Sequence, residues 1–233
     1  MNEGSGARRR GRGHPVIDRE GMLGAALELL DEVGVDGLSM RRLAERLGVK
    51  AASLYWHVRN KEELLGLLAD EICAGVREPD PDLPWREKLG TLVRENRRVL
   101  LGHRDAARIL AGTVPSGPNR LRLAETMLGT LFGAGFSRRD AARAALLLTD
   151  YATHFAAEEG RLAGAGKVHG PGEAETLARV RQHFESLPED EYPIAVALAG
   201  HLTDPNAEGR FEFGLEVLLD GLEKKLASRG PTG

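Results

Sequence analysis

Six polar side chains between residues 41 and 61 carry hydrogen-bond donors that are expected to point outward from a stretch rich in alanine and leucine. Guanidinium, hydroxyl, imidazole and ammonium groups donate to phosphate oxygens and to the edges of bases. The donors are Arg41, Arg42, Ser53, Tyr55, His57 and Lys61. Their types and spacing favour contact with nucleic acid.

The residues that must position these donors form a helix-turn-helix pattern over residues 38–61. Leu43 and Ala44 of a first short helix are expected to face Leu54 of a second, and the small Ala44 lets the two helices cross closely. Gly48 can adopt the left-handed conformation that ends a helix and redirects the chain. An ordinary pair of surface helices is the alternative, but the caps and the outward basic residues favour DNA binding.

Composition narrows the class of protein. The 233 residues are rich in helix formers and only 5% aromatic, which predicts an all-α fold. The net charge is −3, yet residues 1–61 hold eleven lysines and arginines against eight acids, whereas the remainder holds 21 against 27. The single cysteine, Cys73, excludes an internal disulfide framework. No stretch reaches the ~18 apolar residues of a membrane span, so we expect a cytoplasmic protein without membrane contact.

The chain divides into three functional segments. Residues 1–15 are rich in glycine and arginine and predict a disordered basic arm, either a solvated tail or a further DNA contact. Residues 16–77 predict the helix-turn-helix domain with its connecting helix. Three prolines within residues 78–84 end that helix. Residues 85–228 then predict a larger helical domain.

Short polar residues mark where helices begin and end. Asp18, Ser39 and Asn60 each precede an apolar periodic run and are expected to cap its first turn. Gly34 is expected to end the first helix. Asp105 is placed to cap a helix at about 104–111.

Apolar periodicity predicts seven helices after the prolines. Their expected bounds are 85–101, 104–111, 118–132, 138–160, 174–186, 191–200 and 208–227. Helix 138–160 is apolar on nearly all sides, and helix 208–227 carries a broad apolar stripe. One short recognition helix contacts too few bases, so the reading head needs a second copy of the chain. These two helices are the expected self-association surface.

At this point the sequence resembles the tetracycline-repressor (TetR) family of transcriptional regulators, in the branch with a tetracycline-repressor-like C-terminal domain. The resemblance rests on Ala25–Leu30, Arg41–Gly48, Leu54–Val58 with Asn60-Lys61, His103–Asp105, Gly112-Thr113 with Pro115, Gly135-Phe136, Phe213–Glu216 and Gly221–Glu223. It implies a homodimeric repressor with an effector pocket in each C-terminal half. Filling that pocket is expected to tilt the connecting helix and spread the two reading heads on operator DNA.

The resemblance also implies roles for residues of the reading head. Arg41 stands where the family places a guanine-reading arginine, which suits a bidentate guanidinium. Trp56 is expected to pack rather than to touch DNA. The residues expected at double-stranded operator DNA are Met40, Arg41, Ala51, Ala52, Ser53, Tyr55, His57 and Lys61.

The effector pocket departs from the family pattern. Leu110 stands where the tetracycline repressor has a metal-binding histidine, and the lone acid Glu158 binds a hard cation poorly. The expected pocket residues are Leu92, Asn96, Leu110, Thr113, Met127, His154 and Glu158. We therefore expect no metal, no cofactor and no response to magnesium-tetracycline, but a bulky, largely apolar small-molecule effector.

Two other functions are compatible with parts of the sequence. A helical enzyme would have to use His154 and Glu158, one helical turn apart, but no catalytic or cofactor motif accompanies them. A DNA-binding regulator without an effector is the other alternative.

Overall fold

The computed structural model describes residues 18–165 and 172–228, so the predicted arm over residues 1–15 lies outside the described part. The all-α prediction is confirmed there, since every regular element in those two ranges is a helix. The helices are α1 Arg19–Gly37, α2 Met40–Leu47, α3 Ala51–Leu54, α4 Lys61–Ala74, α5 Trp85–Leu101, α6 Ala106–Ala111, α7 Pro118–Gly133, α8 Arg138–Ala165, α9 Glu173–Glu185, α10 Pro193–Leu202 and α11 Ala207–Ala227.

The predicted caps of the N-terminal helices are confirmed. The side chain of Asp18 accepts a hydrogen bond from the backbone of Gly21, that of Ser39 from Arg42, and that of Asn60 from Glu63. These bonds satisfy amide groups that have no partner inside the helix. The first helices therefore begin where their polar residues place them.

Two glycines redirect the chain between these helices. Gly34 has a φ of 70° and a ψ of 173°, which breaks α1 as predicted, although helical residues resume for one turn after it. Gly48 ends α2 in the left-handed region with a φ of 67°. A side chain at either position would be strained by the backbone alone.

The hydrophobic core consists of two clusters that meet along α5. The first joins α1 to α4 with the end of α5, α6 and Ala156 of α8. The second joins the start of α5 with α7, α8 and α11. The first cluster contains residues from both sides of the proline-rich linker at residues 78–84. The helix α4 therefore shares its core with the C-terminal half. The predicted functional boundary at this linker stays a prediction.

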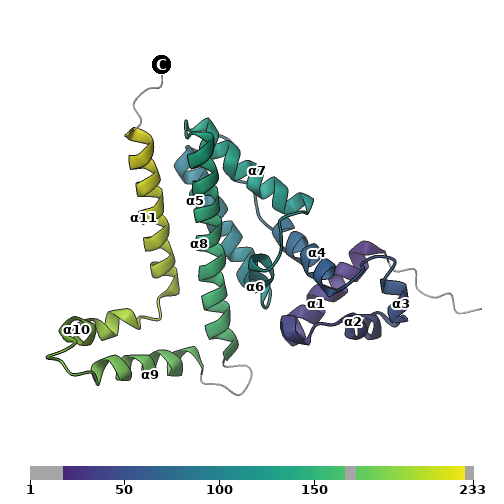
Figure 1. The fold of residues 1–233 in the computed structure, drawn as a ribbon, viewed down its shortest axis with the longest axis horizontal. Helices are drawn as coiled ribbons and strands as arrows, with labels where there is room; N and C mark the ends of the chain where they lie inside the picture. Colours follow the sequence, from purple (N-terminus) through teal and green to yellow (C-terminus); the bar gives the residue numbers. More distant parts are fainter. Residues whose placement is uncertain (1–17, 166–171, 229–233) are drawn as a thin grey trace, which may run out of the picture.

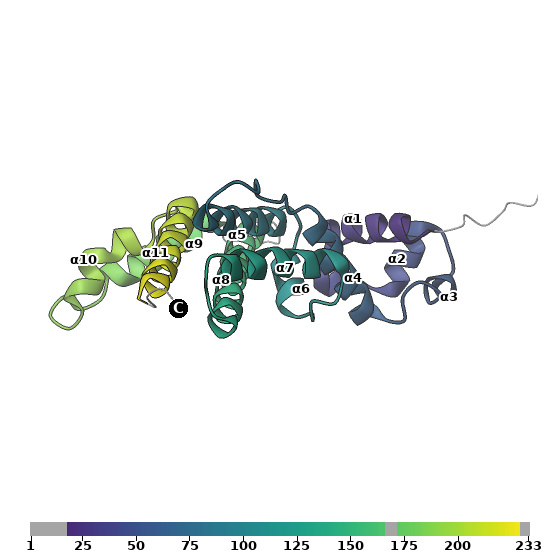
Figure 2. The same cartoon turned by 90° about the horizontal axis from the view of Figure 1, so that it is seen from above.

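The molecule is elongated. Figure 1 shows α1 to α3 at one end of the long axis and the α9–α10 hairpin at the other, with α5, α7 and α8 between them. Figure 2, turned by a right angle, gives the same order. The predicted reading head therefore lies far from the hairpin.

Asp105 does not cap α6 as predicted. It occupies the N-cap position with a φ of 58°, but its carboxylate accepts a hydrogen bond from the backbone of Val35, at 2.8 Å. The reason is tertiary, because Gly34 turns the amide of Val35 toward this carboxylate. A Cβ on Gly34 would lie 2.7 Å from the carboxylate oxygen of Asp105. Other helix bounds differ from prediction by a few residues, the largest change being the extension of α8 to Ala165.

Candidate nucleic-acid interface and ligand site

The reading head is built from α2, a tight turn at Gly48 and α3. Leu43 and Ala44 of α2 and Leu54 of α3 are buried against one another. At the turn, the backbone of Gly48 donates to Glu45 and that of Val49 donates to Ala44. These bonds satisfy the last carbonyls of α2 and fix the angle between the two helices.

The structure places the predicted DNA-contacting residues on α2, α3 and the turn that follows, except Lys61, which begins α4. Arg41, Ala52, Tyr55 and His57 are exposed, whereas Ala51 and Ser53 are half-buried. Met40 is half-buried too, and it packs against the first core cluster. These exposed residues come from one short stretch. Figure 2 places α2 and α3 at one end of the molecule.

Arg41 is available for base recognition. Its side chain is 86% exposed and its Nε donates to Glu45 one helical turn away, at 2.9 Å. An exposed pair of this kind contributes at most about 1 kcal/mol, so DNA can displace it. Arg42 is less available, because its guanidinium donates to the carbonyl of Gly37.

Lys61, which is predicted to contact phosphate, has a partner within the chain. Its Nζ donates to the carbonyl of Val35 at 2.7 Å, which ties the start of α4 to the last turn of α1. Contact with a phosphate would require the ammonium to share or exchange this bond. Lys61 therefore has a structural role within the head in addition to any role at DNA.

Trp56 does not pack as predicted. Its side chain is 89% exposed. The helix α3 ends at Leu54, and residues 55–57 form a turn, so Leu54 and Val58 fill the core while Trp56 is directed away from it. An exposed indole beside Tyr55 extends the apolar and hydrogen-bonding surface of the head.

The predicted pocket residues fall into a buried group and an exposed group. Leu92, Asn96, Leu110 and Met127 are buried on α5, α6 and α7. Leu92 and Met127 belong to the second core cluster and Leu110 to the first. Asn96 lies between them on α5, and its Oδ1 atom is buried without a hydrogen-bond partner. These four residues border the junction of the two clusters.

His154 and Glu158 lie apart from that group. Both are exposed on α8. The Nδ1 atom of His154 lies 2.8 Å from the carbonyl of Asp150, and Glu158 lies 3.7 Å from the guanidinium of Arg210. Within a single chain, His154 and Glu158 therefore do not join the four buried pocket residues.

An open groove of roughly 600 Å³ lies between α4 and the segment that joins α6 to α7. Thr113 is the predicted pocket residue that lines it. Opposite are Glu62, Glu63 and Leu67 of α4. In residues 18–165 and 172–228, no three His, Cys, Asp or Glu side chains are grouped to hold a metal ion. In the same ranges, none of the helices combines the length and the apolar character that a membrane crossing needs.

Sequence reasoning missed the ion pairs that fix α11 on α5. Arg97 is buried, makes two hydrogen bonds of 2.8 Å to Glu159, and also pairs with Glu208. Its guanidinium carbon lies 4.3 Å from the ring centre of Phe211. The hydrogen bonds that Arg97 donates to the carboxylate of Glu159 raise the pKa of Arg97. The four-residue spacing of acids along α11 was the available signal, because it matches arginines on a facing helix.

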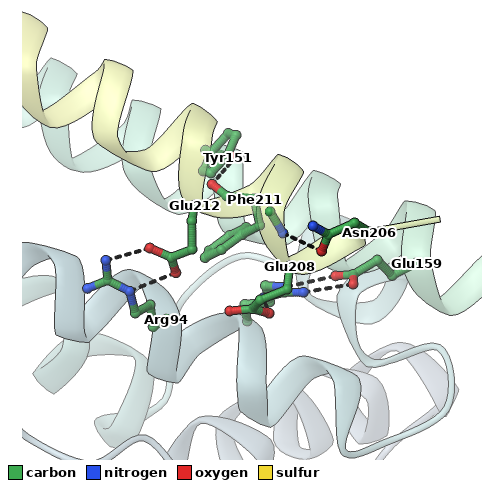
Figure 3. Close-up of polar contacts among 9 residues, drawn as sticks. Arg94, Tyr151, Glu159, Asn206, Glu208, Phe211 and Glu212 are labelled. Atoms are coloured by element: carbon green, nitrogen blue, oxygen red, sulfur yellow. Dashed lines mark hydrogen bonds and ion pairs between the residues drawn. The ribbon is translucent and has the colours of Figure 1, made fainter. Parts of the chain in front are cut away.

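A second ion pair and a tyrosine complete this contact. Arg94 donates twice to Glu212, at 2.8 and 2.6 Å, and this bond lowers the pKa of Glu212. Figure 3 shows the bidentate pair beside Phe211, whose carbonyl accepts a hydrogen bond from Tyr151 at 2.7 Å. The helix α11 is thereby held in one register against α5 and α8.

Comparison with known proteins identifies the chain. Residues 78–226 match the family described as tetracyclin repressor-like, C-terminal domain, and residues 22–68 match bacterial regulatory proteins of the tetR family. The chain belongs to the TetR family. This TetR-family chain is a ligand-responsive DNA-binding regulator, and the family binds operator DNA and small-molecule effectors, typically as dimers.

Similar proteins extend over nearly the whole chain. The class A tetracycline repressor of Escherichia coli is 39% identical over 86% of this chain and 88% of its own length. The ActR protein of Streptomyces coelicolor, solved with actinorhodin, has a TM-score of 0.82 and 34% identity, covering 94% of this chain and all of that one. A TetR variant from Acinetobacter baumannii, solved with minocycline, has a TM-score of 0.67 and 32% identity over 89% and 97%.

Proposed function

We propose that this TetR-family chain is a homodimeric repressor that leaves a palindromic operator when a small, largely apolar molecule occupies its C-terminal half. The observation that carries the proposal is a pair of unpartnered apolar faces on α8 and α11. Leu146 is 66% exposed on α8, and Phe213 is 73% exposed on α11. Leu147 and Val217 beside them are about half exposed. Apolar side chains gathered on two neighbouring helices mark a protein interface.

A second copy of the chain is the occupant we propose for these faces. Both helices also carry an inward stripe, so each is apolar on two sides, as a helix within a bundle must be. The hairpin adds a third exposed stripe on α10, formed by Ile194, Leu198 and Leu202. Because this hairpin extends away from the body, a partner packed on α8 and α11 would lie within its reach (Figure 1).

Within that dimer, we assign the reading of bases to α2 and α3. Arg41 offers a bidentate guanidinium to guanine. Ala51 and Ala52 offer methyl groups for apolar contact with bases, where a side-chain amide would form two hydrogen bonds to one base. The operator is therefore expected to differ from the tetracycline operator. Ser53 is assigned to the bases as well, and Tyr55, His57 and Lys61 are assigned to sugar and phosphate. This division gives specificity to few residues and affinity to many.

We place the effector at the junction of the two core clusters. Leu92, Leu110 and Met127 make this region apolar, while the unpartnered Oδ1 atom of Asn96 favours an effector with one hydrogen-bond donor. The side chain of Leu110 supplies no metal ligand. Magnesium-tetracycline is therefore not the proposed effector. The cytoplasmic location that we expect from the sequence stays a prediction.

Selection of binding sites from random duplex DNA tests the proposal. We expect two-fold symmetric sites, with two chains bound per duplex by light scattering. Bulky, largely apolar compounds, with actinorhodin as the first, should then be added to the preformed complex, with magnesium-tetracycline as the control. Recovery of sites without symmetry would contradict the dimer. Release by magnesium-tetracycline would contradict the assigned pocket chemistry, and a complex that no compound releases would favour a regulator without an effector.

A further inference from the structure

The helix α4 carries the reading head, and one buried carboxylate attaches its distal half to the body. Asp70 is 8% exposed. Its Oδ1 atom accepts a hydrogen bond of 2.9 Å from the backbone of Arg120, and its Oδ2 atom accepts one of 3.1 Å from the side-chain amide of Asn119. Both donors belong to the first turn of α7. A residue of the connecting helix therefore binds directly to the start of a helix in the effector half.

This contact substitutes for a missing cap. The N-cap position of α7 is Gly117, which has no side chain to accept from the first turn, and Pro118 follows it. Amides at a helix N-terminus need acceptors and carry partial positive charge, so a carboxylate is well placed there. Asp70 provides that acceptor from a different helix, and the start of α7 depends on the position of α4.

Glycine at position 117 is required by the contact. A Cβ built there would lie 2.1 Å from Cγ of Asp70. The φ of Gly117 is −86°, which any residue can adopt, so the backbone alone would accept alanine. The steric restriction therefore comes from the close approach of α4 and α7.

Arg120 extends the contact toward the candidate effector region. Its guanidinium donates to the carbonyls of Leu110, Thr113 and Val114 and, at 2.8 Å, to the hydroxyl of Thr113. Burial lowers the pKa of Arg120. The end of α6, the first turn of α7 and the middle of α4 are thus one hydrogen-bonded unit. Leu110 and Thr113 are also residues of the proposed pocket.

The groove between α4 and residues 112–118 lies on the head side of this unit. It separates Glu62, Glu63 and Gly66 of α4 from the α6–α7 segment, while Asp70 lies at its edge in contact with that segment. The helix α4 is thus attached to α7 at Asp70 and faces open space nearer the head. A shift of the α6–α7 segment would act on α4 at this point and be amplified along the helix.

We propose that Asp70, Gly117, Asn119 and Arg120 form a clamp through which the effector half sets the position of the reading head. Asp70 is a positioning residue in this proposal, and its bonds to α7 fix the angle of α4 in the DNA-binding state. The inference rests on the proposed function, because it requires two heads held at a defined spacing. The proposal names the side chains that transmit the effect of ligand binding to the operator-binding head.

Two substitutions break the clamp from opposite sides. Asp70→Ala removes the acceptor, and Gly117→Ala inserts a methyl group against Asp70. The double variant removes the closest contacts, with Cγ and Oδ1, but a Cβ at position 117 would still lie 2.6 Å from the Cβ of residue 70. We therefore expect its effect to be smaller than the sum of the two single effects; this non-additivity identifies a direct contact. Glu71→Ala is the matched control, because this neighbouring acid on α4 is exposed and its loss changes the net charge equally.

The readouts are operator affinity and the distance between the two heads. A spin label on Glu20→Cys, at the exposed start of α1, reports that distance by pulsed electron resonance. Cys73 is buried, and burial raises its pKa to about 11, so it stays unlabelled. We expect one narrow distance in the wild type and in Glu71→Ala. In both clamp variants we expect a broad distribution and about tenfold weaker binding to the selected operator.

The outcomes separate the two proposals. A wild type that is monomeric or binds no operator overturns the proposed function. A dimeric, operator-binding wild type whose distance and affinity are the same in Asp70→Ala and Glu71→Ala overturns the clamp. If Asp70→Ala fails to fold, Asp70→Asn keeps one acceptor and the volume, and we expect a smaller broadening in the same direction. A folded Asp70→Asn with wild-type distance, or an unfolded one, also overturns the clamp and leaves Asp70 a purely structural residue.

Discussion

The reading head and the effector half hold their functional groups in opposite ways. In the head, the candidate DNA contacts lie within residues 40–61, and all of them are exposed or half-buried. In the effector half, the candidate ligand residues come from α5, α6, α7, α8 and the α6–α7 segment, and those at the cluster junction are buried. The head is a local structure that a short sequence can specify. The effector half is a tertiary structure, and its exposed apolar faces indicate that a second copy completes it.

The largest expected effect concerns the buried ion pairs of the effector half. Arg97→Met should lower the free energy of unfolding by about 3 kcal/mol, because it leaves the carboxylate of Glu159, which is only 14% exposed, without its partner. Chemical denaturation measures this loss. Arg46→Met is the control in the head, where the guanidinium pairs with the exposed Glu32, and we expect a loss of about 1 kcal/mol or less. Equal losses would remove the contrast between the two regions.

The next effect concerns the proposed dimer faces. Phe213→Glu places a charge on the exposed face of α11 and should yield a monomer. Because one head contacts a single half-site, this monomer should bind the operator on the order of 100-fold more weakly than the wild type. Light scattering and titration with the operator measure both. Phe132→Glu is the matched control, since Phe132 is an exposed phenylalanine on α7. A dimeric Phe213→Glu would show that α11 is not at the interface.

Much of the head could be predicted from the sequence, because its caps and turns are formed by residues that lie close together in the chain. Asp18, Ser39 and Asn60 cap the helices that directly follow them, and Gly48 needs only its own backbone conformation to end α2. Trp56 was predicted wrongly because α3 ends at Leu54 and the turn over residues 55–57 directs the indole away from the core. Helix existence and order in the remainder followed from apolar periodicity and from the prolines.

The contacts that join distant segments could not be predicted. Asp105 was expected to cap its own helix, but the carboxylate binds Val35, seventy residues away in the chain. Asp70 and Arg97 each look like an ordinary polar position on an amphipathic helix until a second helix is placed beside them. Their partners depend on helix packing, which a pattern of residue types does not specify.

A smaller effect distinguishes base reading from attachment within the head. Arg41→Ala should cost about 1–3 kcal/mol at one base pair of each half-site and relax specificity there. Lys61→Ala should weaken binding to all sequences and flatten the dependence on salt. Because Lys61 also bonds to Val35, its variant should in addition unfold more easily. Competition with single-base operator variants measures the difference, and identical profiles would contradict the assigned roles.

The smallest effect is the acid sensitivity of the link between the two regions. Arg98 lowers the pKa of Glu95 to about 2, and Glu95 also accepts from the backbone of Arg77, just after α4. Its stabilising contribution is complete above the unfolded pKa of about 4.3 and is lost as pH falls toward 2. Glu95→Gln should therefore be less stable than wild type at neutral pH and equal to it near pH 2. Glu87→Gln, exposed on the same helix, serves as the control.

The most direct measurement is the number of chains bound to the selected operator, together with the dependence of that affinity on salt. We predict two chains per two-fold symmetric duplex and binding that weakens steeply as salt rises, because two heads each release counterions from phosphates. A single chain per duplex, or an affinity that salt leaves unchanged, would contradict the account of paired heads held by the C-terminal helices.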